Sequence, residues 1–229
     1  MKIGFLGLDL PLGKQKFKDK NLSLLEEKFS PKKTTPFFVE FVGDDFAHSD
    51  VIICRKDKKL DLIIEDLSKI EQRLKKEIPP QEKNVMLKLK DNLEKEVFIS
   101  AMEIPLEDKE LIRNLGFITL KPVVEVLDGG DINRIIEEAL SAAGIIFFYT
   151  VGPKEAKGWP LKKGSNIVEA AAKIHTDFAK GFIRADVVNI KELGNFHNMN
   201  DARQKGLVKT VGKDYIVEYG DIIEIKFSV

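Results

Sequence analysis

This sequence has little of what marks several protein classes. It contains one cysteine, Cys54, which excludes an intramolecular disulfide and a zinc site built from several cysteines. No apolar run approaches the length of a membrane span, and the N-terminus lacks the long apolar segment of a signal peptide. Lysine and arginine total 37 against 37 acidic residues, which excludes a polybasic nucleic-acid binder. A cytoplasmic protein with no membrane contact is therefore expected.

The C-terminal third carries the most regular pattern in these 229 residues. Asn166 and Glu169 have capping-box spacing, and apolar residues recur at helical spacing through Phe178, so one helix is predicted here. Gly181 ends it, and residues 182–190 (FIRADVVNI) alternate as a strand. The runs FFYTV, AKGWPL, GLVKTV, DYIVEY and DIIEIKFSV predict further short strands around the helix.

Several segments of this part of the sequence resemble those of a known family. IHTDFAKGFIRADV, GPKEAKGW and GKDYIVEYGD are similar, in the same order, to the C-terminal TGS domain of the YchF, or Obg-like ATPase, family. The resemblance implies an α/β chain whose C-terminal part is a β-grasp, ubiquitin-like domain, in which a curved mixed sheet holds one helix. It further implies a shrunken P-loop-like domain over residues 1–145, with a helical hairpin at about 60–97, and a TGS domain over residues 146–229.

The first strand and turn, KIGFLGLDLPLGKQ, look like a phosphate-binding loop that has drifted. A working loop has a glycine, four residues, and then Gly-Lys followed by Ser or Thr, whose hydroxyl holds magnesium. Here five residues separate Gly7 from Gly13, and Lys14 is followed by Gln15, which has no hydroxyl. These four residues, together with Asp128 and Asp131 of a later motif, are the nucleotide-binding candidates if binding is retained. The alternative is an ordinary loop after a strand.

Two further family motifs are altered. Family members have an Asp-x-x-Gly that supports magnesium and contacts the terminal phosphate; the residues in its place are Gly43, Asp44, Asp45 and Phe46. The base-reading Asn-x-x-Glu becomes Asp128 and Asp131, and a carboxylate lacks the N–H donor of an amide. Either acidic pair can equally lie in a simple turn. Because phosphoryl transfer depends on positioning and on metal, we expect no catalytic residue, no metal site and no cofactor.

Residues 60–97 predict two amphipathic helices separated by Pro79 and Pro80. The first helix presents Leu60, Ile63, Leu67, Ile70 and Leu74 at alternating spacings of three and four. The resemblance implies a shortened version of the family's coiled-coil insertion. Two interpretations stay open: a hairpin packed on its own domain, or an arm that binds a protein partner.

The C-terminal domain holds thirteen basic and ten acidic residues from position 150 onward, a surplus of three. The candidate RNA- or partner-binding residues are Lys154, Lys157, Lys162, Lys163, Lys173, Lys180 and Arg184. Lysines beside Trp159 could contact phosphate while the ring stacks on a base, or the ring could pack inward while the lysines are solvated. The polar loop over residues 194–206 is either a mobile ligand-facing segment or a solvated connector.

These observations predict a non-hydrolysing interaction module that binds RNA or the ribosome. An enzyme is the first alternative: an ATP or GTP hydrolase that uses Lys14 with magnesium and substitute acidic residues. A small-molecule sensor acting through the TGS domain is the second. His175 is expected to have a structural role at the end of its helix.

Overall fold

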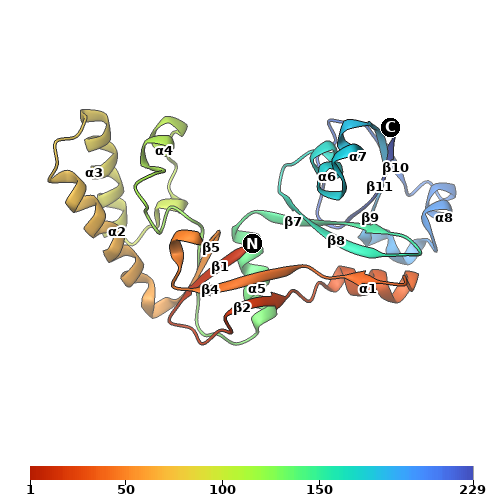
Figure 1. Cartoon of the computed structure of the whole chain (residues 1–229), viewed down its shortest axis with the longest axis horizontal. Helices are drawn as coiled ribbons and strands as arrows, with labels where there is room; N and C mark the ends of the chain where they lie inside the picture. The colour runs from red at the N-terminus through yellow and green to blue at the C-terminus, as the bar shows by residue number, and fades with distance from the viewer. Residues whose placement is uncertain (229) are drawn as a thin grey trace. The chain divides into compact units, whose positions relative to one another are not determined.

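The computed structural model describes residues 1–228, which form two compact units (Figure 1). The first unit contains residues 1–15 and 39–143, and the second contains residues 16–38 together with the chain from residue 144 onward. The α/β class predicted from the sequence is confirmed, since each unit combines a sheet with helices. A boundary at residue 145 misses the N-terminal segment 16–38, which belongs to the second unit.

The sheet of the first unit has the strand order β2-β4-β1-β5-β6. Its strands are β1 (Lys2–Leu6), β2 (Gly13–Lys16), β4 (Phe38–Gly43), β5 (Val51–Arg55) and β6 (Val123–Val126). β1 pairs in parallel with both β4 and β5, and β5 pairs in parallel with β6. The first four residues of β5 are all buried, which is typical of a central parallel strand covered on both faces.

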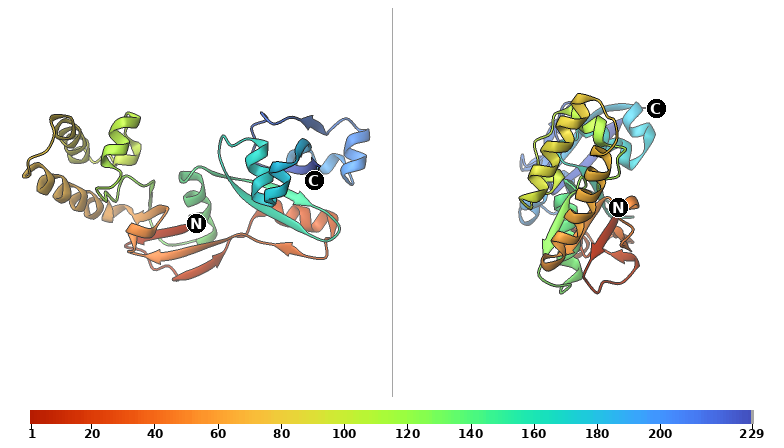
Figure 2. Two further views of the ribbon diagram at one scale, coloured as in Figure 1. Left: turned by 45° about the horizontal axis from the view of Figure 1, so that its top comes forward. Right: turned by 90° about the vertical axis from the view of Figure 1, so that its left-hand side faces the viewer.

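Helices of the first unit include an antiparallel hairpin, α2 (Lys59–Leu74) and α3 (Pro80–Glu94), which lie side by side in Figures 1 and 2. The other helices are α4 (Leu106–Ile112) and α5 (Ile132–Ala142), with 3-10 turns η1 (Phe46–His48), η2 (Lys56–Lys58) and η3 (Ile99–Ala101). Ile63 and Ile70 of α2 share a core with Met86 and Leu89 of α3 and with Ile112. The apolar seam of the hairpin is therefore filled by the unit's own residues.

A buried carboxylate fixes the hairpin to the chain before β6. Asp66 of α2 has no exposed surface, and it accepts hydrogen bonds from the backbone N–H groups of Ile118 and Thr119 at 2.8 Å each. It also accepts the Thr119 hydroxyl at 2.7 Å. Burial raises the pKa of Asp66, and the three donors oppose that rise.

The second sheet has the order β10-β9-β11-β7-β8-β3. Its strands are β3 (Thr34–Thr35), β7 (Ile145–Val151), β8 (Ala156–Lys162), β9 (Phe182–Asn189), β10 (Lys209–Val211) and β11 (Asp221–Phe227). β7 pairs antiparallel with β8 but parallel with β11, so the sheet is mixed. Ile167 and Ala170 of the helix α6 pack against Phe148 and Val187 on one face, as the TGS resemblance implies.

Residues 16–38 cover the other face of β7 and β8. Helix α1 (Lys20–Phe29) begins after Asp19, whose carboxylate caps Asn21 and Leu22 and accepts the Tyr149 hydroxyl at 2.8 Å. Phe17 packs 5.6 Å from the ring of Phe147. β3 extends the sheet by pairing in parallel with β8. These contacts join residues more than 100 positions apart, so local patterning did not predict them.

Three local predictions for the second unit need correction. The single helix predicted through Phe178 is two helices, α6 (Ile167–Ile174) and α7 (Thr176–Lys180), because His175 is extended and its Nδ1 accepts the Asp177 N–H. The capping box of Asn166 and Glu169 is present. The 194–206 loop contains helix α8 (Met199–Gln204), capped by Asn198 after the 3-10 turn η4 (Ile190–Asn195).

The strand predicted from DYIVEY is the third correction. Residues 214–219 form one isolated bridge, between Ile216 and Asn166, rather than a strand of the sheet. Tyr215 and Val217 instead exchange backbone hydrogen bonds with the entrance to α6. The alternating pattern is therefore satisfied locally.

Among the helices in the described part of the chain, none combines the length and the apolar composition needed to cross a bilayer.

Candidate functional site

The carboxyl edge of the parallel strands is where an α/β sheet most often binds ligands. In the first unit, the loops after β1, β5 and β6 meet at this edge. A methyl group added to Gly7 would lie 2.6 Å from Cγ of Lys58, and one added to Gly129 would lie 3.6 Å from the backbone oxygen of Asp9. These loops hold three of the six residues that the sequence nominated for nucleotide binding, namely Gly7, Asp128 and Asp131.

Gly13, Lys14 and Gln15 are the exception, because they lie in β2. In a phosphate loop the Gly-Lys pair opens a helix, whose N–H groups and dipole hold the anion. The extended backbone at Lys14 and Gln15 instead points successive N–H groups to opposite sides, so the segment does not form a phosphate cradle. Lys14 is exposed, and within the described chain the next helix starts at Lys20.

Gly7 keeps the backbone geometry of a loop glycine, with φ +72°. The space where its side chain would lie is taken by the Lys58 stem, at 2.6 Å, and by Cβ of Arg55, at 3.4 Å. The loop therefore needs glycine at position 7, because atoms of the protein itself fill the space that a side chain would take.

Asp128 and Asp131 are both engaged in local structure. Asp131 caps α5 by accepting the Asn133 N–H at 2.9 Å, and Asp128 accepts the Gly130 N–H at 3.1 Å. Both residues are exposed. These bonds agree with the interpretation of Asp-Gly-Gly-Asp as a turn that closes β6 and starts a helix.

Two further acidic residues near the sheet, Asp45 and Asp57, also have partners. Asp45 accepts from His48 Nδ1 at 2.8 Å, and this hydrogen bond lowers the pKa of the Asp45 carboxyl. Arg55 donates to both oxygens of Asp57 after β5, which lowers the pKa of Asp57. Within residues 1–228, no three His, Cys, Asp or Glu side chains are grouped so that they could hold a metal ion.

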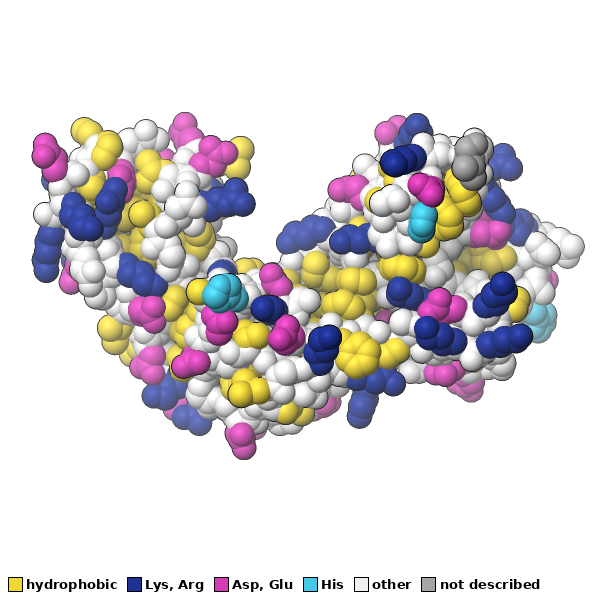
Figure 3. Space-filling view, viewed as in Figure 1, with side chains coloured by type: hydrophobic (Ala, Val, Ile, Leu, Met, Phe, Trp, Pro, Cys, Tyr) yellow, Lys and Arg dark blue, Asp and Glu magenta, His cyan; other side chains and the backbone are white. Residues whose placement is uncertain are grey.

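The basic candidates of the second unit fall on different parts of its surface. Lys157 lies on the helix-bearing face of β8, whereas Arg184 lies on the opposite face of β9, between the inward residues Ala185 and Phe182. Lys173 and Lys180 are exposed on α6 and α7. Figure 3 shows lysine and arginine interspersed with acidic side chains over the face that it draws.

A smaller group follows strand β8 and its neighbour β3. Lys154 precedes β8, Lys157 lies within it, Lys162 ends it and Lys163 follows. Lys32 and Lys33 join them from the N-terminal segment, because the Lys32 N–H bonds to the Pro153 carbonyl and the Lys33 carbonyl accepts from Ala156. We call these six lysines the β8 basic edge. Sequence reasoning missed Lys32 and Lys33, since only β3 pairing brings them there.

The Trp159 ring is held by three neighbours. It stacks on Phe148 at an interplanar angle of 13°, and Lys157 Nζ lies 3.7 Å from the ring centroid in a cation–π contact. Its Nε1 donates to the Thr150 hydroxyl at 2.9 Å. The ring is half-buried against the core, which favours the structural interpretation over base stacking.

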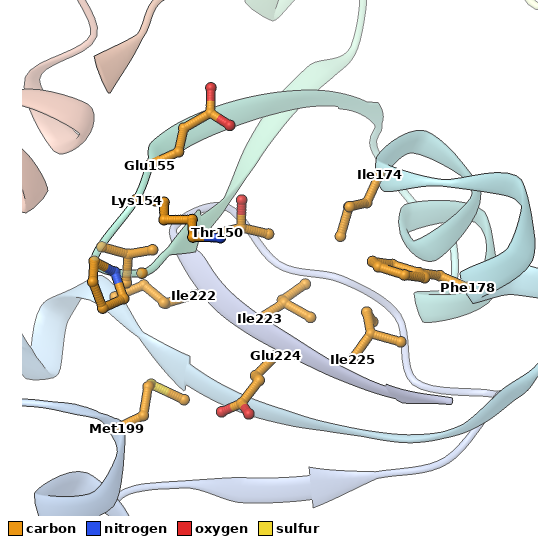
Figure 4. Close-up of a pocket in the computed structure, with 13 residues that line it drawn as sticks. Thr150, Lys154, Glu155, Ile174, Phe178, Met199, Ile222, Ile223, Glu224 and Ile225 are labelled. Atoms are coloured by element: carbon orange, nitrogen blue, oxygen red, sulfur yellow. The ribbon is translucent and has the colours of Figure 1, made fainter. Parts of the chain in front are cut away.

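A cavity of about 570 Å³ opens at the end of β7 (Figure 4). It is lined by residues 150–155, by Ile174 and Phe178, by Met199 and by residues 222–225 of β11. A second cavity, of about 590 Å³, adjoins it around Pro153 and Met199 and reaches the end of α1. The 194–206 segment thus lines both cavities, although as a short helix rather than as the predicted loop.

Comparison with known proteins agrees with this architecture. Residues 145–228 match the YchF-GTPase C-terminal family model, which is described as a protein of unknown function, DUF933. A ribosome-binding ATPase YchF from Buchnera aphidicola is 26% identical over 271 aligned residues, which take in 93% of this chain and 71% of that protein. This chain is similar to the YchF and Obg-like ATPases.

Shorter alignments show higher identity. Obg-like ATPase 1 of Danio rerio is 41% identical over 97 residues, which are 42% of this chain and 24% of that protein. The solved structure of the Schizosaccharomyces pombe YchF GTPase superposes with a TM-score of 0.77 at 18% identity, covering 99% of this chain and 97% of that one. The superposition shows that the fold is shared.

Proposed function

We propose that this YchF relative is a ribosome-associated interaction protein that does not hydrolyse nucleotide. The names of its relatives support the ribosome as partner, since several are called ribosome-binding ATPases. The observation that carries the second half of the proposal is the placement of Lys14 on β2. Without a helix start at that lysine, the principal anion-binding element of the family's chemistry is lost.

The β8 basic edge is the surface we assign to ribosomal RNA. Its lysines contact phosphates rather than bases, because the Trp159 ring already stacks on Phe148 and lies against Lys157. Phosphate contacts give affinity that falls with salt through release of counterions. The modest number of lysines fits a salt-sensitive and transient association.

Co-sedimentation with purified ribosomes over a range of potassium chloride concentrations tests this assignment. The double variant Lys157→Glu with Lys163→Glu should weaken binding by at least about tenfold and lower the slope of log affinity against log salt by about 1 for each lysine. Lys213→Glu, an exposed lysine of the same unit outside the β8 basic edge, is the matched control. Equal effects of the two changes would show that the β8 basic edge is not the contact.

A nucleotide-binding ATPase or GTPase is the second candidate, favoured by the three loops that still meet at the carboxyl edge of the first sheet. Thermal shift with ATP and GTP, with and without magnesium, separates the two. Our proposal expects no stabilisation that depends on Lys14. Stabilisation by magnesium nucleotide that Lys14→Ala abolishes, together with phosphate release, would establish the enzyme instead.

A further inference from the structure

One wall of the cavity at the end of β7 is an open strand edge. β11 pairs with β9 along its whole length, from Asp221 to Phe227. With β7 it pairs at a single position in the described chain, Ile222 opposite Tyr149. Beyond that pair, residues 150–152 and 223–225 line opposite sides of the cavity. The two central strands have therefore separated there.

The separation leaves backbone groups of β11 directed at the cavity. In an antiparallel pair, alternate residues exchange both hydrogen bonds with the partner strand, and the residues between them turn N–H and C=O the other way. Beyond Ile222, the β11 backbone groups that point away from β9 face the space beside β7. An edge of this kind is a template for one more strand.

The side chains around this edge are apolar and only half covered. Ile225, Phe178, Ile174 and Met199 are each half-buried, and all four line the cavity. Figure 4 shows Ile223 and Ile225 extending from β11 toward Ile174 and Phe178 of the two short helices. Alternate side chains of an added strand would point into this apolar hollow.

The charges at the rim leave one cation without a partner. Glu224 is held by Arg203 and Lys226, and Glu155 is held by Lys33 and the Thr35 hydroxyl. Among residues 1–228, Lys154 makes no ion pair, and Figure 4 shows its amine beside Thr150 at the mouth of the cavity. The complementary group on a ligand is therefore a carboxylate.

We propose that this cavity binds an extended peptide segment of a protein partner, which adds a strand to the open edge of β11. An apolar side chain of the peptide would occupy the hollow between Ile174 and Phe178, and an acidic side chain would pair with Lys154. Main-chain bonds give such sites their affinity, and the hollows for alternate side chains give them selectivity. This site shares Lys154 with the β8 basic edge, but its main-chain and apolar contacts are separate from the phosphate contacts proposed there.

Titration of the isotope-labelled full chain, followed by amide NMR, tests the site. The probe is a blocked six-residue peptide with alternating leucine and valine and one glutamate. We expect saturable shifts at residues 150–152 and 223–225, with half-saturation below about 1 mM. Lys154→Glu should weaken binding of this peptide by about tenfold. The same variant should prefer a peptide in which lysine replaces the glutamate. Lys213→Glu, an exposed lysine outside both the cavity and the β8 basic edge, should leave both affinities unchanged within about twofold.

Backbone recognition is tested separately. The same peptide N-methylated at alternate amides should lose binding, because methylation removes the donors of an added strand. Equal binding of the methylated peptide, or of hexanoate alone with the same shifts, would overturn the proposal and identify a small-carboxylate site. Shifts confined to other residues, or no saturable shift, would also overturn it.

Discussion

The hydrogen bond between Tyr149 and Asp19 offers the sharpest test of the way in which the N-terminal segment joins the second unit. Both groups are buried, and the Tyr149 hydroxyl donates to the carboxylate at 2.8 Å across 130 positions of sequence. Tyr149→Phe deletes this donor without leaving a cavity, since the ring remains. A hydrogen bond to a charged group contributes about 1.5–3 kcal/mol, so we expect a loss of that size in the free energy of unfolding at neutral pH.

The pH dependence of this loss gives a second check. Burial raises the pKa of Asp19 above its usual value, and the Tyr149 hydroxyl partly counters the rise. Because the folded pKa lies above the unfolded one, the ionised carboxylate costs stability, and this cost disappears as pH falls through the folded pKa. A protonated Asp19 depends less on the donor. The effect of Tyr149→Phe should therefore shrink as pH falls from about 7 toward about 4.

Urea unfolding followed by Trp159 fluorescence measures both quantities, because Trp159 lies in the same sheet as Tyr149. Lys213→Ala, which changes an exposed residue of the same unit, is the control and should alter stability by less than about 0.5 kcal/mol. A loss from Tyr149→Phe no larger than the control's, or a loss that grows as pH falls, would refute the assignment of Asp19 as a buried, charged anchor.

Three further outcomes follow from buried groups. Asp66→Ala should lower the free energy of unfolding by about 3 kcal/mol, since two backbone N–H groups and a hydroxyl lose their acceptor. Amide exchange at Ile118 and Thr119 should also become faster. Asp61→Ala, at an exposed position of the same helix, should change neither quantity. Burial raises the pKa of Asp186, but hydrogen bonds from Thr210 and Arg203 outweigh burial, so its pKa is lowered overall. Arg203→Lys should therefore reduce the free energy of unfolding by about 1–2 kcal/mol at neutral pH and by less in acid, where the carboxylates are protonated. Denaturation at two pH values checks this. Burial raises the pKa of the Cys54 thiol to about 11, so iodoacetamide at about pH 8 should label only unfolded protein, as mass spectrometry would detect.

Local patterns predicted the elements whose partners are near in sequence. The amphipathic repeats correspond to α2 and α3, which pack against each other. The capping box predicted where α6 begins, but the end of that helix depends on one side chain, His175, which caps α7 in place of continuing α6. A cap formed by histidine has no clear sequence signature.

The site was less predictable than the fold. The sequence shows which residues of the phosphate motifs have been lost. It does not show that Gly13–Lys16 forms a strand, because that strand depends on pairing with β4. The cavity of the second unit depends on the separation of β7 and β11, which both read as ordinary strands. Lys32 and Lys33 reach the β8 basic edge through pairing with a strand more than 100 positions away. Register between distant segments is set by packing rather than by local pattern.

Gly7 distinguishes a loop that retains space for a ligand from a loop packed on its own chain. In a phosphate loop, glycine lets the backbone approach phosphate. Here the Lys58 stem lies 2.6 Å from the point that a methyl group on Gly7 would occupy, whereas Gly13, with φ +88°, has no atom within 4 Å of that point. Gly13→Ala should therefore lose only the conformational term of about 1–2 kcal/mol. Gly7→Ala should lose more, because it adds a clash.

Combining Gly7→Ala with Lys58→Ala should remove the excess, since the clash disappears while the backbone term remains; urea denaturation followed by far-ultraviolet circular dichroism would measure each variant. Lys58→Ala alone should be nearly neutral, because its ion pair with Asp61 is exposed. If Gly7→Ala proves no worse than Gly13→Ala, the Lys58 stem does not fill the loop. The space beside Gly7 would then be open to a ligand, and the nucleotide-binding alternative would gain the room it requires.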